Sequence, residues 1–344
     1  MRASSCREKT NKCFNFILLI FILALAPVSL NAQVIHNYVF FGMDREKISN
    51  INFLSIKNFE GAQLKYTWKE LEPQKNKYDF SEITKDLKFL NNHNKKLFLQ
   101  IQDSTFSINR KFVPSYILNK KEYNGGAVIQ YSFNDDESSG IPEGWVAKRW
   151  NPKVAERFHK LLVALGEKFN GKVAGINLPE TAIGVSENKK FKPNDFTYSK
   201  YRDAIIENMK VIKKAFPDSA VIQYVNFMPG EYLPWTDKSY LRSIFNYANK
   251  NNIGVGGPDL FPYKKGFMNN TYNFIHNING NVTVSVAAQD GNYSYIDPKT
   301  KKKIKINAMY DFAKSYLKTD YIFWCTEEPY FDKEVVPFIK NLKS

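Results

Sequence analysis

The sequence predicts an α/β protein, a single (β/α)8 TIM barrel with a long insertion after its third strand. Eight short apolar runs alternate along the chain with amphipathic helical stretches. No Gly-rich phosphate loop follows any of these runs, which argues against the alternative, an open doubly wound sheet. No linker divides residues 33–344, and this length suits one barrel with loop insertions.

The first 32 residues have the pattern of a signal peptide. Basic residues precede an apolar core, Phe14 to Pro27, that is too short for a typical spanning helix. The small residue Ala32 is the expected cleavage point. Cleavage there predicts a secreted or periplasmic protein with no stable membrane insertion, and an uncleaved anchor is the alternative. Beyond the leader only Cys325 remains, so an internal disulfide is excluded.

The eight apolar runs are the expected barrel strands. Strands buried on both faces of a parallel sheet are typically short and continuously apolar. The runs cover residues 39–42, 62–66, 97–101, 173–177, 220–225, 253–255, 282–287 and 321–325.

Apolar residues spaced three and four apart predict the helices between these strands. The pattern is clearest from Val154 to Phe169, and it recurs at residues 83–90, 205–216, 241–248 and 309–316. Asn151-Pro152 is a favourable N-cap and first-turn pair ahead of the Val154 helix.

One region departs from the strand–helix repeat. Residues 103–150 separate the third strand from its helix, and they contain turn clusters at 124–126 and 135–140. Residues 127–133 and 145–150 are expected to pair as a hairpin. Loops of this length in compact domains are usually functional, so we expect the insertion to form a cleft wall or lid.

The run at residues 173–177 is followed by Leu178, Pro179 and Glu180. Proline cannot donate to a strand ladder and therefore suits a strand end. In a (β/α)8 barrel, residues just past the strand ends form the active-site face. We therefore expect Glu180 to be a catalytic acid, against the alternative of a helix cap or surface charge.

Polar and aromatic residues also follow the other strands. If the barrel closes, these side chains converge on one mouth. The set comprises Trp68, Gln102, Tyr224, Asn226, Asp259, Gln289, Asp290, Trp324, Glu327 and Glu328.

Composition and motifs exclude several function classes. The net charge is +15, but the lysines are scattered and no nucleic-acid-binding motif accompanies them, so no nucleic-acid partner is expected. The four histidines have no metal-ligand spacing and no Ser-His-Asp pattern is present, so neither a metal nor another cofactor is expected.

A resemblance to a known family is visible from Tyr66 to Phe80. This stretch, with Trp68, Glu72-Pro73 and Tyr78-Asp79-Phe80, resembles the W-x-x-(I/L)-E-P-x-x-G-x-Y-D-F segment of (β/α)8 glycoside hydrolases. The similarity is to β-galactosidase and β-xylosidase-like members of the large retaining clan. It covers the second and third units, and the remaining units correspond only in architecture.

The resemblance implies roles for individual residues. In that clan the acid/base is a Glu after the fourth strand, the place of Glu180, although Pro179 stands where Asn is common. The nucleophile is a Glu after the seventh strand, where this chain has Gln289 and Asp290. A Trp on the eighth strand is often a sugar platform, and Trp324 matches it.

The sequence therefore predicts an exported glycoside hydrolase that acts on a polysaccharide or oligosaccharide, neutral or anionic. The alternative is a non-catalytic carbohydrate-binding TIM barrel, suggested by the missing Glu after the seventh strand. Glu328 is the preferred partner of Glu180, with Asp290 and Glu327 as alternatives. Glu328 would favour inversion and Asp290 retention, because the two mechanisms need different carboxyl separations.

The other residues of the strand-end set are expected to bind sugar. Trp68, Trp324 and Tyr224 could stack on sugar faces. Gln102, Asn226 and Gln289 could hydrogen-bond hydroxyls, and Asp259 and Glu327 would add carboxylates to the same mouth.

Overall fold

The computed structural model describes residues 34–133, 139–185, 188–278 and 282–343, so the predicted signal peptide lies outside the described residues. No helix in the described part of the chain is long and apolar enough to cross a membrane.

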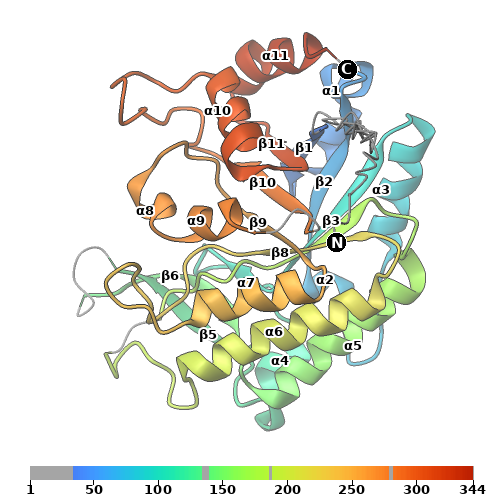
Figure 1. Ribbon diagram of the computed structural model, residues 1–344. Helices are drawn as coiled ribbons and strands as arrows, with labels where there is room; N and C mark the ends of the chain where they lie inside the picture. The colour runs from blue at the N-terminus through green and yellow to red at the C-terminus, as the bar shows by residue number, and fades with distance from the viewer. Residues whose placement is uncertain (1–33, 134–138, 186–187, 279–281, 344) are drawn as a thin grey trace, which may run out of the picture. The chain divides into compact units, whose positions relative to one another are not determined.

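Eight parallel strands close into a barrel, which confirms the predicted fold (Figure 1). Each strand overlaps one of the eight apolar runs. Around the barrel the neighbours are β1, β11, β10, β9, β8, β7, β3 and β2, and the ring closes between β2 and β1. In chain order the strands are β1 (His36–Gly42), β2 (Phe59–Thr67), β3 (Lys96–Gln102), β7 (Gly175–Leu178), β8 (Ala220–Tyr224), β9 (Gly254–Gly257), β10 (Val284–Ala288) and β11 (Tyr321–Cys325).

Helices surround the barrel, and the five amphipathic stretches are all helical. Asn151 caps α5 as predicted, because its Oδ1 accepts hydrogen bonds from the amides of Lys153 and Val154 at 3.0 and 3.2 Å. The helices are α1 (Ile51–Ser55), α2 (Trp68–Leu71), α3 (Ser81–Asn92), α4 (Ser115–Asn119), α5 (Pro152–Phe169), α6 (Tyr198–Ala215), α7 (Tyr240–Lys250), α8 (Lys265–Met268), α9 (Thr271–His276), α10 (Ile306–Phe312) and α11 (Val336–Lys340), with shorter helical turns at Arg45–Ser49, Lys121–Tyr123, Ala313–Leu317 and Phe331–Val335.

The barrel interior changes from aromatic to polar towards the strand C-termini. Near the strand N-termini, the rings of Tyr38 and Phe323 pack around Phe98, with centroids 6.0 and 5.0 Å from it. The next layer is polar, because Gln63 Nε2 donates to Asn177 Oδ1 at 2.9 Å and to the Tyr224 hydroxyl at 3.1 Å. The polar groups therefore approach the end of the barrel where Glu180 lies.

The segment that carries the family resemblance forms a buried structural contact. Trp68 Nε1 donates to Glu72 Oε2 at 3.0 Å, and the Asn76 amide donates to Glu72 Oε1 at 3.1 Å. Arg157 on α5 pairs with the same carboxylate. Asn76 stands at the glycine position of the motif, and its φ of +62° explains the preference for a residue that tolerates this conformation.

The insertion after β3 contains a small antiparallel sheet. Strands β4 (Ser104–Thr105), β6 (Ile141–Ala147) and β5 (Ala127–Ser132) lie in that order. The hairpin is confirmed, but its second strand begins at Ile141 and ends before Trp150, so the predicted bounds 145–150 were wrong. Arg149 does not continue the strand because it turns inward to bind Asp103. Residues 134–138 of the predicted turn lie outside the described residues.

The insertion contacts the loop that follows Glu180. The Tyr131 amide on β5 donates to the Gly184 carbonyl at 2.9 Å. A Cβ on Gly184 would lie 2.0 Å from the Tyr131 carbonyl oxygen, so only glycine allows this approach. The insertion is therefore part of the structure that positions the loop.

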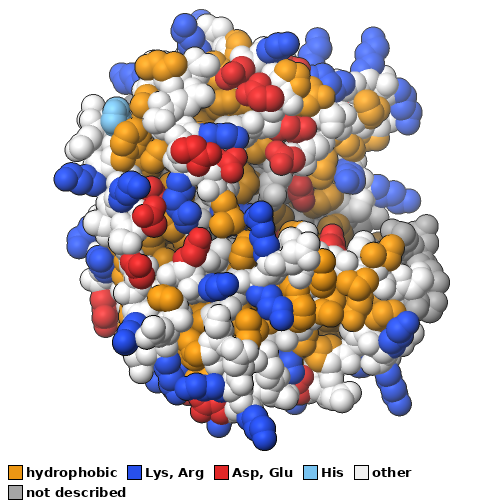
Figure 2. All heavy atoms as spheres, turned by 180° about the vertical axis from the view of Figure 1, so that it is seen from behind, with side chains coloured by type: hydrophobic (Ala, Val, Ile, Leu, Met, Phe, Trp, Pro, Cys, Tyr) orange, Lys and Arg blue, Asp and Glu red, His pale blue; other side chains and the backbone are white. Residues whose placement is uncertain are grey.

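Basic side chains are spread over the face seen in Figure 2 and do not form a single stripe. This distribution agrees with the scatter of lysines along the sequence.

Gly61 on β2 gives a test of the barrel packing. A Cβ there would lie 2.1 Å from the Lys96 carbonyl oxygen and 2.6 Å from the Tyr38 ring. We expect Gly61→Ala to lower the free energy of unfolding by about 1–3 kcal/mol, because neither neighbour has room to move. Denaturant unfolding measures this loss.

Gly266→Ala is the matched control. Its Cβ would meet nothing within 4 Å, and Gly266 lies in α8. The free energy of unfolding should change by no more than about 0.5 kcal/mol. Equal losses in the two variants would contradict the packing described for β2.

Candidate active site

The fourth barrel strand, β7, ends at Leu178 and places Glu180 two residues beyond it. Pro179 terminates the strand as predicted, and its carbonyl accepts a hydrogen bond from Gln223 Nε2 at 2.7 Å. Glu180 is half-buried and lies far in sequence from the start of α6 at Tyr198, so it does not cap that helix.

The environment of Glu180 favours its protonated form. Burial raises the pKa of this carboxyl to about 7, and the Asp259 charge adds to the rise. Three groups oppose the shift: a 2.5 Å hydrogen bond from Asn226 Nδ2 and the charges of Arg149 and Lys65. A carboxyl with this pKa is still substantially protonated near neutral pH and can donate a proton.

Arg149 holds the backbone around Glu180. Its guanidinium makes a two-point ion pair with Asp103, with Nη2–Oδ1 at 2.6 Å and Nε–Oδ2 at 2.8 Å. Its Nη1 donates to the Glu180 carbonyl at 2.8 Å and to the Tyr201 hydroxyl at 2.7 Å. Tyr201 in turn donates to the Thr181 carbonyl at 2.9 Å.

Asn226, predicted from the end of the fifth strand, binds both the side chain and the loop of Glu180. Besides the bond to the carboxyl, its Oδ1 accepts from the Ala182 amide at 2.9 Å. The backbone amide of Asn226 donates to Thr181 Oγ1 at 3.0 Å. Asn226 therefore orients the carboxyl as well as tuning its pKa.

Asp259, Asp290 and Glu328 follow β9, β10 and β11, so they belong to the same end of the barrel as Glu180. Asp259 is half-buried and accepts from Asn292 Nδ2 at 3.0 Å. Burial raises the Asp259 pKa, while the Asn292 hydrogen bond and Lys264 oppose the rise.

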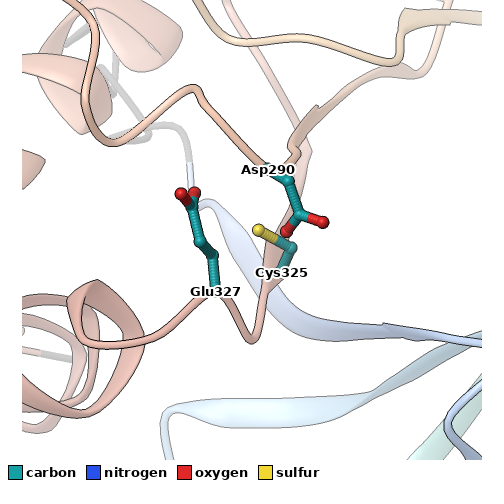
Figure 3. A group of neighbouring side chains, drawn as sticks. All are labelled: Asp290, Cys325 and Glu327. Carbon is teal, nitrogen blue, oxygen red and sulfur yellow. The ribbon is translucent and has the colours of Figure 1, made fainter.

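Asp290 is exposed and lies beside Cys325 and Glu327 (Figure 3). One ligand-type atom from each of the three residues lies within 4.8 Å of the others. Glu327 Oε2 also accepts from the Gly291 amide at 2.9 Å. Burial, assisted by the Asp290 charge, raises the pKa of the Cys325 thiol to about 12, so the thiol stays protonated at neutral pH and is a poor metal ligand.

Glu328, the partner preferred from sequence, points to a different environment. It is exposed, and its pKa is raised by slight burial and by Asp332, with Lys333 and Lys47 opposing. None of these charged neighbours belongs to the group around Glu180. The sequence predicted that Glu328 follows the eighth barrel strand, β11. The direction of its side chain could not be predicted from the sequence.

Two of the predicted sugar platforms are covered. Trp68 and Trp324 are both 0% exposed. Trp68 packs edge-on against Phe158 and bonds Glu72, while Trp324 Nε1 donates to Asn37 Oδ1 at 2.9 Å. Neither ring face is open to a sugar, so their assignment to substrate binding is corrected to a structural role.

The remaining predicted binding residues divide by depth. Tyr224 is buried in the polar layer and bonds Gln63, so it lies beneath the mouth. Gln102 is 7% exposed and accepts from Ser104 Oγ at 3.4 Å. Gln289 is half-buried directly after β10.

Exposed aromatic side chains occur on the loops after β8 and β9. Trp235 is 77% exposed, and Phe227, Tyr232 and Tyr263 are also exposed. These loops follow strand C-termini, on the same side of the barrel as Glu180. The Tyr263 ring is partly covered, because the Lys299 ammonium lies 3.7 Å from its centre.

Sequence reasoning missed Arg149 and Lys65. Lys65 lies two residues after Gln63 on β2, so both side chains point into the barrel. A lysine near the end of a buried strand was the available signal. Arg149 had no comparable signal, because its partners Asp103, Glu180 and Tyr201 come from three separate segments.

Comparisons with known proteins support the fold. No protein-family model matches the chain, and no curated protein matches it. Among solved structures, xylanase 10B from Thermotoga petrophila RKU-1, in complex with xylobiose, is similar with a TM-score of 0.51 at 12% identity, over 85% of this chain and 82% of the xylanase chain.

Two β-galactosidases are similar as well. The Bacillus circulans sp. alkalophilus enzyme has a TM-score of 0.54 at 11% identity, over 85% of this chain and 50% of that chain. The enzyme from the Antarctic haloarchaeon Halorubrum lacusprofundi has a TM-score of 0.51 at 11% identity, over 84% of this chain and 52% of that chain. At such identities the likeness establishes a shared fold: this chain has a (β/α)8 barrel of the kind found in these glycoside hydrolases.

Proposed function

We propose that residues 33–344 form an exported glycoside hydrolase that cleaves O-glycosidic bonds in a polysaccharide or oligosaccharide. One observation carries the proposal: Glu180 follows the fourth strand of a glycosidase-type barrel, and its pKa is raised to about 7. Glycosidic cleavage needs a protonated carboxyl beside the leaving oxygen, and a pKa in this range supplies it.

Glu180 is the general acid in this scheme. Asn226 orients its carboxyl. Arg149 holds the backbone at the Glu180 carbonyl and, by way of Tyr201, at the Thr181 carbonyl. A proton donor held in this way is positioned before the substrate arrives, which lowers the entropic part of the barrier.

Asp290 is the partner carboxylate in this scheme. Lys65 interacts electrostatically with both Glu180 and Asp290, whereas Glu328 is exposed and is not among the charges that act on Lys65 or on Glu180. A carboxylate after the seventh barrel strand could act as a nucleophile or a base in the two-carboxylate scheme. Glu327, next to Asp290, is the alternative, and the stereochemical outcome depends on which carboxylate acts.

A non-catalytic carbohydrate-binding barrel is the second candidate function. It is favoured by the sequence Gln289-Asp290 at the place where related barrels carry a nucleophilic Glu. Such a protein would retain glycan binding without turnover, so the same variants separate the two functions.

The first test is digestion of a glycan panel by the wild type, Glu180→Gln and Asp290→Asn. We expect each variant to lose roughly a hundredfold to ten-thousandfold in kcat/KM, because each removes one of the two reacting carboxyl functions. Reducing-end release measures the rate.

Glu328→Gln is the matched control, an equivalent change on the neighbouring strand end, and it should keep most of the activity. Loss of activity in Glu328→Gln but not in Asp290→Asn would return the partner role to Glu328. Glycan binding without turnover by the wild type would establish the binding-barrel alternative.

The second test is the pH profile of kcat/KM. Activity should fall as pH rises through about 7, because Glu180 must be protonated to donate. Asn226→Ala removes a donor that stabilises the ionised carboxyl, so it should raise the Glu180 pKa and move the alkaline limb to higher pH. An unchanged limb, or a shift to lower pH, would contradict the role given to this hydrogen bond.

The third test uses stability and needs no substrate. The folded-state pKa of Glu180 lies above the ordinary value, so the folded protein binds the proton more tightly and loses stability as pH rises from about 4.5 to about 7. Glu180→Gln cannot ionise. Its melting temperature should therefore exceed that of the wild type at pH 8. The difference between the two proteins should be smaller at pH 5, where the wild-type carboxyl is protonated. The same difference at both pH values would indicate an ordinary pKa.

A further inference from the structure

Lys65 brings a positive charge into the barrel mouth. It lies two residues beyond Gln63 on β2, so both side chains face the barrel interior, with Lys65 nearer the strand C-terminus. The Lys65 ammonium is 5.6 Å from the centre of the Phe40 ring on β1. The lysine is half-buried, directly above the polar layer formed by Gln63, Asn177 and Tyr224.

Apart from the Phe40 ring, the described residues offer the Lys65 ammonium no hydrogen-bond or ion-pair partner. Among the described residues it makes no hydrogen bond, and no carboxylate lies within the 4.0 Å of an ion pair. Glu180 and Asp290 act on it only from longer range. Burial lowers the Lys65 pKa and the two carboxylates oppose that shift, so a bound anion would further favour the charged form.

The rim of the mouth repeats the same chemistry. Three lysines lie over aromatic rings in segments that follow barrel strands. Lys111 is 3.7 Å from the centre of the Trp145 ring on β6, in the insertion after β3. Lys264 lies over Phe261 at 4.0 Å and Lys299 over Tyr263 at 3.7 Å. Lys264 also acts electrostatically on Asp259. Paired aromatic and cationic groups provide a stacking face and a charge for the same ligand.

We propose that the sugar held at this mouth carries an anionic substituent, a carboxylate or a sulfate ester, which Lys65 binds. The substrate class is then an anionic glycan, with the rim lysines contacting further charged units. The inference rests on one part of the proposed function, which is that the barrel mouth binds carbohydrate.

The protonated state of Glu180 is compatible with this ligand. Glu180 is largely protonated below its pKa of about 7, so it does not repel the anion. An ammonium in a half-buried site is less screened by salt than a surface lysine, and a charge-assisted contact there is correspondingly strong. The competing interpretation is that Lys65 serves only to offset the nearby carboxylates.

The experiment measures binding in the Glu180→Gln background, so that turnover does not interfere. The probes are a uronic-acid oligosaccharide with its carboxyl-reduced counterpart, and a sulfated galactan oligosaccharide with its desulfated counterpart. Calorimetry compares Lys65→Met, which keeps the length of the side chain without its charge, with Lys250→Met.

Lys250 is the control because it is exposed at the C-terminal end of α7, and its replacement changes the net charge equally. We expect Lys65→Met to weaken binding of an anionic probe about ten- to hundredfold. Its neutral counterpart should be affected by less than about twofold, and Lys250→Met should leave both nearly unchanged. The more tightly bound anionic probe identifies the substituent as carboxylate or sulfate.

Several results would overturn the inference: equal weakening of charged and neutral probes by Lys65→Met, no weakening of either, or preferential binding of the neutral probes by the parent protein. Binding of the anionic probes by the parent should also weaken as salt rises, a readout that needs no variant at Lys65. The protein could prefer the anionic probes and yet cleave neither the probes nor any glycan of the digestion panel. That result would reject the proposed hydrolase activity and would leave the inference about anionic binding intact.

Discussion

Arg149 and Asp103 form a buried two-point ion pair that joins the end of β3, the end of the insertion and the loop after β7. A buried pair of this kind adds little net stability over apolar packing, yet removal of one partner typically costs about 3–5 kcal/mol. Its main effect is therefore on geometry. The remaining guanidinium donor reaches the Glu180 carbonyl and Tyr201, so the position of the acid depends on this pair more than on the local chain.

The raised pKa of Glu180 results from a balance of opposing effects. Burial alone would strongly favour the neutral acid, and Asp259 acts in the same direction. Asn226, Arg149 and Lys65 oppose it, which keeps the pKa near 7 and leaves the group able to give up its proton. The balance draws on four strands or strand ends, and only a closed barrel brings them together. The fold thus supplies the chemistry through convergence of separate segments.

The sequence predicted the periodic features well. All eight strands and the helices around Val154 and Ile205 appear, because burial on a barrel wall imposes a local pattern of apolar residues. It placed Glu180 and Asn226 after the fourth and fifth strands because a strand end is also a local feature. It failed for Trp68 and Trp324, whose rings are buried against Phe158 and Asn37, and for Arg149, because the direction of a side chain and its partners depend on tertiary packing.

The central claim is that Glu180 is a carboxylic acid protonated near neutral pH at the mouth of the barrel. Carbon-13 NMR of protein labelled at the glutamate carboxyl, assigned by the signal missing from Glu180→Gln, measures this directly. We predict a Glu180 titration with a pKa of about 7. A titration near the ordinary glutamate value of about 4.3 would contradict the account, because the carboxyl would then be ionised when the leaving oxygen needs its proton.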